Sequence, residues 1–188
     1  MGASLLAPPT ALATRSAAAP APPPPPAPPR VPPGWARVKG GKMHKSVVRS
    51  LASTLNARYV SAETAYTGDE HAMLRARATE VGPGERFDFE WENSTGSYVL
   101  RSRQNGRYVS TELGYPGYKY GMLRARATEV GPSERYALFQ NKRTARYALL
   151  SKANSRFVST ELGYTAGSHG MLRARATAIG SLEQFKIS

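Results

Sequence analysis

The sequence predicts an all-β domain with threefold internal symmetry, and three observations support that prediction. The hexapeptide Leu74–Thr79 recurs as Leu123–Thr128 and again as Leu172–Thr177, so three copies follow one another at an equal spacing. Within each copy, short runs of β-forming residues alternate with turn-forming ones. Helical periodicity is weak, and glycine and proline interrupt the chain too often for long helices. Equal copies of this kind indicate a closed threefold object rather than an open array, which would need atypical caps.

Further blocks repeat in the same register as the hexapeptide, without insertion or deletion. They are Arg58–Ser61, Arg107–Ser110 and Arg156–Ser159, then Gly82, Gly131 and Gly180, then Glu85, Glu134 and Glu183, then Phe87, Tyr136 and Phe185. The three repeats therefore span about 43–91, 92–140 and 141–188. Together they define a predicted domain over residues 43–188.

Each repeat is predicted to hold four short strands, and the middle repeat shows them most clearly. Its strands are expected at Tyr98–Ser102, Arg107–Thr111, Leu123–Ala127 and Arg135–Phe139. Asn105-Gly106 separates the first two, and Asn-Gly between β-forming runs is a strong hairpin signal because both residues tolerate positive φ. The other repeats have weaker turn pairs at that place, Asn-Ala and Asn-Ser.

The third strand of each repeat alternates between aliphatic residues and arginine. In the middle repeat, Leu123, Ala125 and Ala127 are expected on the core face, and Arg124 and Arg126 on a solvent-facing side. Leu74, Leu123 and Leu172 are accordingly expected in the core, as are Tyr59, Tyr108 and Phe157.

Four strands repeated three times match a β-trefoil, in which six strands form a barrel and six form hairpins that cap it. The last predicted strand, Phe185–Ser188, should close the barrel against 46–52, leaving no exposed edge there. A three-bladed propeller is the structural alternative, but natural propellers usually have four or more blades.

The first 42 residues are predicted to be an unstructured Ala/Pro-rich leader and linker. Twelve of the 15 prolines lie in the first 33 residues, and large apolar side chains are few. Ala11-Leu12-Ala13 fits the small-x-small pattern of a signal-peptidase site, although the basic segment that should precede it is missing. The segment is therefore either the remnant of a signal peptide or a plain leader, and secretion is slightly favoured over a cytoplasmic location.

The charge of the chain favours an anionic partner. Lysine and arginine number 26 against 13 acidic residues, a net charge of +13. Five basic and no acidic residues precede Met43, which leaves 21 − 13 = +8 on the predicted domain. Such a field suits nucleic acid, an acidic glycan or an acidic protein. The chain has no cysteine and no apolar run of 18 residues, which excludes disulfides and a membrane-spanning helix.

The repeated residues resemble those of the fascin-like β-trefoil family. The similarity lies in Asn-Gly-Arg-Tyr-Val-Ser-Thr-Glu, Gly-Met-Leu-Arg-Ala-Arg-Ala and Gly-Pro-x-Glu-Arg-Tyr, and it covers residues 43–188. The resemblance implies a binding or cross-linking module whose partner is filamentous actin or, as in related trefoils, a glycan. It transfers no actin-contact residues, and the Gln-x-Trp pattern of ricin-type sugar-binding trefoils is missing.

Two repeated sets of side chains are the candidate ligand contacts. The first is a tyrosine in a glycine-bearing loop, where a ring could stack on a sugar: Tyr66, Tyr115 and Tyr164. The second is a pair of arginines that could hold carboxylate or sulfate groups: Arg75 with Arg77, Arg124 with Arg126, and Arg173 with Arg175. The alternatives are that each tyrosine folds back onto the barrel, and that the arginines pair with repeated glutamates.

Catalysis finds little support in the sequence. The three histidines form no metal-binding pattern, and no nucleophile elbow or phosphate loop is present. We therefore expect a monomeric, non-catalytic binding module without cofactor or metal. Its partner is predicted to be a carbohydrate or another cell-surface polymer, with filamentous actin as the first alternative and nucleic acid or another polyanion as the second.

Overall fold

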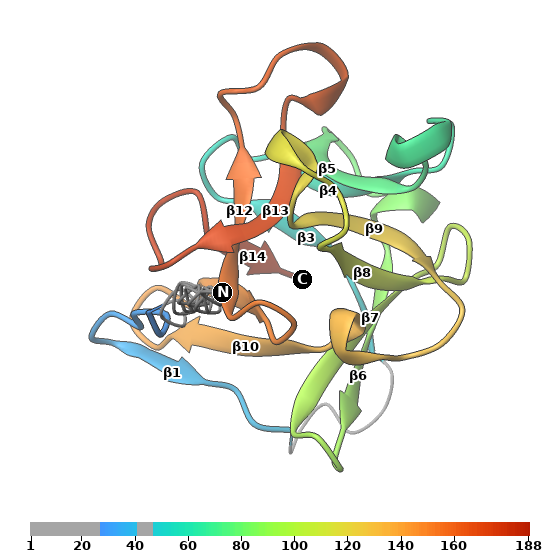
Figure 1. The fold of residues 1–188 in the computed structure, drawn as a ribbon. Helices are drawn as coiled ribbons and strands as arrows, with labels where there is room; N and C mark the ends of the chain where they lie inside the picture. The colour runs from blue at the N-terminus through green and yellow to red at the C-terminus, as the bar shows by residue number, and fades with distance from the viewer. Residues whose placement is uncertain (1–26, 41–46) are drawn as a thin grey trace, which may run out of the picture.

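A computed structural model describes residues 27–40 and 47–188 and confirms the all-β, trefoil-like architecture (Figure 1). The first repeat contains β2 (Val47–Arg49), β3 (Leu51–Ser53), β4 (Tyr59–Glu63), β5 (Met73–Ala78) and β6 (Phe87–Glu92). The second contains β7 (Ser97–Ser102), β8 (Tyr108–Glu112), β9 (Met122–Ala127) and β10 (Tyr136–Asn141). The third contains β11 (Tyr147–Ser151), β12 (Arg156–Glu161), β13 (Met171–Ala176) and β14 (Phe185–Ile187).

The first and last strands of each repeat form a closed barrel. Its order is β2, β6, β7, β10, β11, β14 and β3, and β2 and β3 are successive parts of one strand interrupted at Ser50. The predicted closure is confirmed, because Phe185 pairs with Ser53 and Ile187 pairs with Leu51. The barrel therefore has no open edge between its first and last strands.

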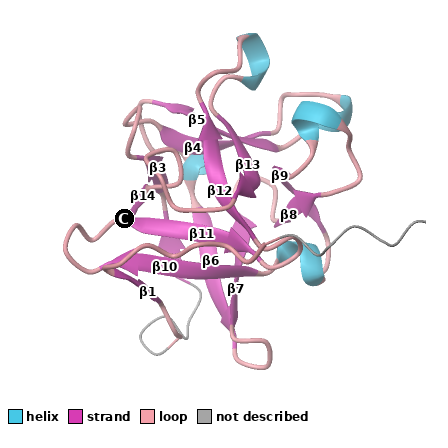
Figure 2. Cartoon of the chain, turned by 60° about the vertical axis from the view of Figure 1, so that its left-hand side comes forward, coloured by secondary structure: helices cyan, strands magenta, loops and turns pink. Residues whose placement is uncertain are grey.

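The middle strands of each repeat form three hairpins, β4–β5, β8–β9 and β12–β13, which we call the hairpin cap (Figures 1 and 2). Strands β5, β9 and β13 also pair with one another. Three backbone hydrogen bonds join the repeats cyclically: Ala76 N–H to Gly170 O, Ala125 N–H to Ala72 O and Ala174 N–H to Gly121 O. Each hairpin is thus held by both of its neighbours.

The core lies inside the barrel and under the cap. Leu74, Leu123 and Leu172 are each 1% exposed, which confirms their predicted burial. Val60, Val109 and Val158 are fully buried in the same cluster, together with Phe87, Tyr136 and Phe185 from the barrel strands. The buried hydroxyl of Tyr136 lies 3.1 Å from Thr111 Oγ1, and burial raises the pKa of this phenol.

The hairpin turns between the first two strands use the predicted asparagines in one shared way. Asn105 Nδ2 donates to the carbonyl of Ala125, and Asn105 Oδ1 accepts from the backbone N–H of Arg107. The following residue has positive φ in all three repeats: 69° at Gly106, 55° at Ala57 and 54° at Ser155. Glycine adopts this conformation without strain, so the first and third turns are the costlier ones.

The structure differs from the predicted unstructured leader at residues 27–40. β1 (Trp35–Arg37) pairs antiparallel with Phe139–Asn141 of β10, and Arg30 forms a bridge with Ala178. β10 pairs with β7 at Tyr136, and β1 pairs with the residues that follow. The prediction failed here because proline-rich composition obscured the short β-forming run at Trp35. Residues 1–26 lie outside the described part of the chain.

A bidentate ion pair links the end of β6 to the start of β10. Arg135 donates from Nε and Nη2 to the carboxylate of Glu92 at 2.6 and 3.0 Å, and Thr95 donates a further hydrogen bond. The hydrogen bond from Arg135 is the main reason that the pKa of Glu92 falls from its ordinary 4.5 to about 2.

Truncation of one axial leucine tests the core assignment. We expect Leu123→Ala to lower the free energy of unfolding by about 2–5 kcal/mol, because it leaves a cavity beneath the cap. Leu55→Ala is the matched control, since Leu55 is 50% exposed and should change little. Denaturant midpoints measure both; a loss below about 0.5 kcal/mol for Leu123→Ala would contradict the core assignment.

Acid titration tests the Glu92–Arg135 pair. A carboxyl with a depressed folded pKa stabilises the fold above its unfolded pKa, and this contribution is lost as the pH falls through the folded value. Stability should therefore decline between pH 4.5 and about 2 in part through Glu92. Urea unfolding across that range should show a shallower decline for Glu92→Gln, whereas the exposed-site control Glu80→Gln should keep the parent slope.

Candidate functional site

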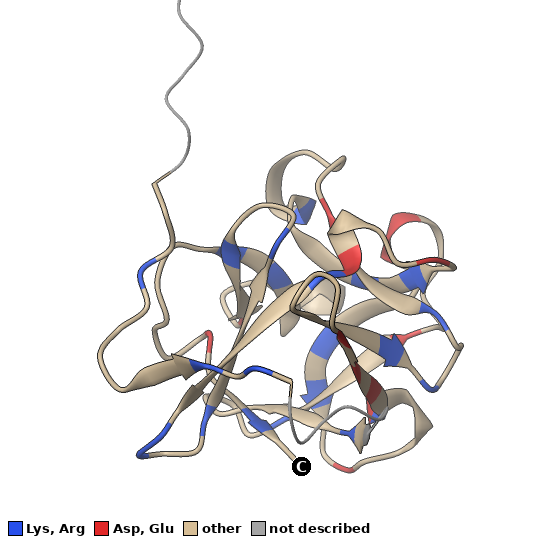
Figure 3. Ribbon diagram, turned by 90° about the horizontal axis from the view of Figure 1, so that it is seen from below, with Lys and Arg blue, Asp and Glu red and all other residues tan. Residues whose placement is uncertain are grey.

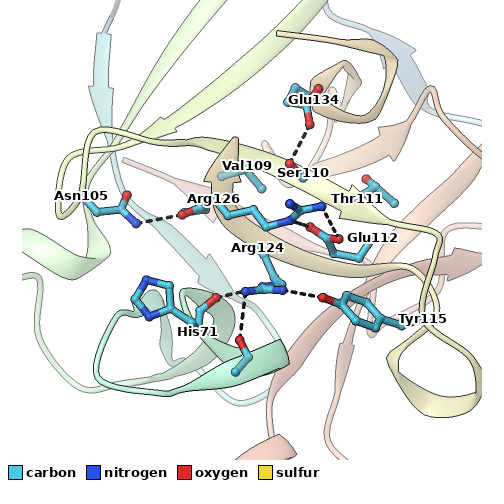
Figure 4. A network of polar contacts seen from close by, with 12 residues as sticks. His71, Asn105, Val109, Ser110, Thr111, Glu112, Tyr115, Arg124, Arg126 and Glu134 are labelled. Carbon is cyan, nitrogen blue, oxygen red and sulfur yellow. Dashed lines mark hydrogen bonds and ion pairs between the residues drawn. The ribbon is translucent and has the colours of Figure 1, made fainter. Parts of the chain in front are cut away.

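One arginine in each repeat is buried on the face of the hairpin cap that the tyrosine-bearing loops cover, and Arg124 of β9 shows its contacts (Figure 4). Its guanidinium donates from Nε to the carbonyl of His71 at 2.9 Å and from Nη2 to the carbonyl of Gly68 at 3.3 Å. Nη1 donates to the hydroxyl of Tyr115 at 2.8 Å. Arg124 therefore joins the tyrosine of its own repeat to a loop of the preceding repeat.

The other two repeats have the same arrangement in cyclic order. Arg173 donates to the carbonyls of Tyr120 and Gly117 and to the hydroxyl of Tyr164. Arg75 donates to the carbonyls of His169 and Ala166 and to the hydroxyl of Tyr66. We call Arg75, Arg124 and Arg173 the inner arginines. Every repeat is thus bound to the one before it by a single guanidinium.

The inner arginines differ from the sequence prediction, which expected them on a solvent-facing side. They are 8%, 6% and 8% exposed, respectively. The first four residues of β5, β9 and β13 are all buried, because the barrel core covers one face of the strand and the tyrosine loops cover the other. Alternation between two faces predicts exposure correctly only where one face meets water.

The three candidate tyrosines are half-buried. They pack against Met73, Met122 and Met171, which form a second, fully buried cluster on the cap. Each inner guanidinium also lies 5.7–6.0 Å from the centre of its tyrosine ring. These contacts support the alternative that the tyrosines fold back onto the scaffold. Contact between their exposed parts and a ligand stays a prediction.

Arg77, Arg126 and Arg175, the outer arginines, are about half exposed and pair with buried glutamates. Arg126 donates from Nε and Nη2 to the carboxylate of Glu112, and this hydrogen bonding raises the pKa of Arg126. Glu63 and Glu161 bind the other two outer arginines. The alternative interpretation, that the arginines pair with repeated glutamates, is correct for this set, and ligand contact by their exposed parts stays a prediction.

The other repeated glutamates have a structural role instead. Glu134 accepts from Ser110 Oγ at 2.6 Å and from the backbone N–H of Gly131 at 2.7 Å, which fixes the turn before β10. Glu85 and Glu183 make the equivalent contacts.

A cleft of about 480 Å³ lies beside the outer arginine of the second repeat. The Tyr115 loop forms one side, the turn at Pro132 forms another, and Glu112 and Arg126 lie between them. The cleft thus offers an aromatic ring, a fixed carboxylate and a half-exposed guanidinium to one ligand.

A second cleft of about 480 Å³ lies where the first and second repeats meet. His71, Asn105, Arg107 and Arg126 line it, and none of its lining residues is acidic. Arg126 lines both clefts, so they lie on either side of one side chain. Basic positions also occur on several sides of the ribbon in Figure 3, with fewer acidic positions among them.

The described residues contain no group of three histidine, cysteine or acidic side chains that could hold a metal ion. Within the same residues, no helix is long and apolar enough to cross a membrane.

Sequence reasoning missed the function of the inner arginines as links between repeats. It also left Tyr118 out of the candidate site, although this residue is 49% exposed and lines a cleft with Tyr164. A signal for Tyr118 was present in the sequence, because the second repeat alone has extra tyrosines in this loop.

Removal of an inner guanidinium tests the link between repeats. We expect Arg124→Met to lower the free energy of unfolding by about 2–4 kcal/mol, since three partly buried acceptors lose a charged donor. Arg107→Met, at an exposed position, is the control and should change stability by less than about 0.5 kcal/mol. Equal unfolding midpoints for the two variants would contradict a linking function.

Comparison with known proteins agrees on the fold. No protein-family model matches the chain, and no curated protein matches it. Among solved structures it is similar to the designed threefold-symmetric protein ThreeFoil, with a TM-score of 0.60 and 16% identity, covering 74% of this chain and 96% of that one. It is also similar to the ricin B-like lectin of Macrolepiota procera in complex with lactose, with a TM-score of 0.57 and 12% identity, covering 79% of this chain and 99% of that one.

A third similar structure is a GlcNAcα1-4Gal-releasing endo-β-galactosidase from Clostridium perfringens, with a TM-score of 0.55 and 9% identity. The match covers 74% of this chain and 31% of the enzyme. At these identities the likeness shows the β-trefoil fold alone. Membership of the fascin-like family and the absence of catalysis both stay predictions.

Proposed function

We propose that the domain is a non-catalytic carbohydrate-binding module that recognises acidic polymers around its hairpin cap. The observation that supports this most strongly is the cleft in which Tyr115, Glu112 and Arg126 meet. Its components recur in each repeat, because Tyr66 and Tyr164 lie in equivalent loops and the Arg–Glu pair is present three times.

The chemistry of this cleft suits a sugar. An aromatic ring can stack on the apolar face of a pyranose, and groups around the ring can bind its hydroxyls. The Glu112–Arg126 pair is bidentate, so both groups are held in place before a ligand arrives. Preorganised polar groups lose less conformational entropy on binding.

The adjoining basic cleft favours ligands with acidic units. Arg126 lies between the two clefts, and Arg107 and His71 extend the second one without a lining carboxylate. A polymer that places a neutral ring beside Tyr115 could place a carboxylate or sulfate beside Arg107. Weak contacts of this kind, repeated on one rigid body, gain strength through effective concentration.

The likeness of the fold to that of a lectin in complex with lactose supports this proposal. The sequence resemblance to fascins suggests actin filaments as the alternative partner, and the net charge suggests other polyanions.

The triple variant Tyr66→Ala, Tyr115→Ala, Tyr164→Ala tests the proposal. We expect it to lose at least tenfold in affinity for polygalacturonate, because stacking is lost in every repeat and tenfold corresponds to about 1.4 kcal/mol. Binding by the parent should also weaken as the salt concentration rises from about 50 to about 300 mM, because salt screens the contacts made by cationic side chains. Surface plasmon resonance on immobilised polymer measures both effects.

The triple Tyr→Phe variant is the control, because it keeps the rings and removes the hydroxyls that bind the inner arginines. Circular dichroism checks that each variant is folded. If the folded Tyr→Ala variant binds as tightly as the parent, the loops are not the site. Parent binding to filamentous actin or to DNA, without binding to polygalacturonate or neutral glycans, would replace the proposal with an alternative.

A further inference from the structure

The three tyrosine loops differ at several positions that the threefold symmetry would make equal, and one of these is Tyr118. Tyr118 of the second repeat corresponds to Asp69 in the first and Gly167 in the third. The Tyr118 side chain is 49% exposed, which is unusual for a large aromatic residue in this structure. The three repeats therefore share a backbone fold but have different side chains in the loops that cover the cap.

Tyr118 lies against the tyrosine loop of the next repeat. Its ring centre is 5.9 Å from that of Tyr164, with an angle of 82° between the ring planes. Tyr118, Gly163, Tyr164, Thr165 and Ser168 line a cleft of about 350 Å³. Two perpendicular rings thus form a corner, with two hydroxyl-bearing side chains beside it.

One buried residue holds both walls of this cleft. Arg173 donates to the carbonyls of Gly117 and Tyr120, on either side of Tyr118, and also to the hydroxyl of Tyr164. The 3₁₀ turn Gly117–Lys119 and the Tyr164 ring are therefore fixed relative to each other in the absence of a ligand.

The cleft lacks lining residues of either charge. Two cations lie close to its rings: Arg173, which is buried and already bound to the Tyr164 hydroxyl and two carbonyls, and Lys119, 5.9 Å from the Tyr118 ring centre. Lys119 also lies 3.7 Å from Asp69 and 3.5 Å from Glu70, so carboxylates of the first repeat already neutralise it. A ligand here meets ring faces and hydroxyls, which is the chemistry that a neutral pyranose satisfies and a carboxylate or sulfate does not.

We propose that the Tyr118–Tyr164 cleft is the strongest sugar subsite of the domain and takes one neutral pyranose ring. This inference rests on the proposed function and sharpens it, because it makes the three repeats unequal. Acidic units of the same polymer would then bind the arginine-lined clefts elsewhere on the cap. The first and third repeats have no ring at the position of Tyr118 and bind more weakly.

Titration calorimetry with three probes tests the inference: lactose, cellotriose and trigalacturonic acid. We expect the parent to bind one of the two neutral sugars with one strong site. Tyr118→Ala should weaken that binding at least tenfold. Tyr120→Ala is the matched control, because Tyr120 is similarly exposed but does not line the cleft, and its affinity should stay within twofold of the parent.

A gain-of-site variant gives a second, independent readout. A Cβ atom at Gly167 would lie 3.8 Å from the Tyr66 hydroxyl, an ordinary contact, so Gly167→Tyr can place a ring beside Tyr66. We expect the number of strong sites for the same neutral sugar to rise from one to two. If the folded variant still has one strong site, the two perpendicular rings are not the element that binds the sugar.

The outcomes separate this inference from the proposed function. If the parent binds the neutral sugar and Tyr118→Ala binds it equally well, the inference is wrong while the proposed function stands. If the parent binds trigalacturonic acid but neither neutral sugar, the inference is again wrong. If the parent binds none of the three probes and no polygalacturonate, both are wrong.

Discussion

The hydrogen bonds of the inner arginines are the interaction on which the cap depends. A charged group that is more than nine-tenths buried destabilises a fold unless several acceptors replace its hydration. Here each guanidinium binds two loop carbonyls and a phenol. Because the carbonyls belong to the preceding repeat, the guanidinium finds its hydrogen-bond acceptors only when the two repeats are correctly placed. The buried charge therefore stabilises the native arrangement against others in which the repeats are apart.

This requirement also explains the form of the tyrosine loops. One of the two carbonyls that accept from each inner arginine belongs to the first residue of a 3₁₀ turn, which is Gly68, Gly117 or Ala166. These residues have positive φ, of 58°, 62° and 48°. Ala166 adopts this conformation at a greater cost than the two glycines do, and the hydrogen bond from Arg75 helps to offset it. Loop shape and arginine burial are thus parts of one constraint.

Repetition made the fold predictable from the sequence, whereas exposure within the cap was not predictable. The register of Leu74, Leu123 and Leu172 identified the core correctly, because a strict period leaves few alternative pairings. Arg124 and Arg126 lie two residues apart on one strand, and both alternate with aliphatic residues and recur in every repeat. Arg124 is nevertheless buried, whereas Arg126 is half exposed. Their difference arises from loops that reach over from another repeat, and a local pattern contains no information about such contacts. The strand at Trp35 was missed because its pairing partner lies about a hundred residues away, in β10.

The near-identity of the third strands has a consequence for assembly. Each cap strand is held by the two neighbouring strands, and all three share the sequence Met-Leu-Arg-Ala-Arg-Ala. A strand from a second chain would present the same side chains in the same register as the one it replaced. At high concentration during folding, two chains can therefore exchange whole repeats and still form the hydrogen bonds between cap strands. Asp69, Tyr118 and Gly167 differ at one equivalent loop position, so this position distinguishes the three repeats from one another.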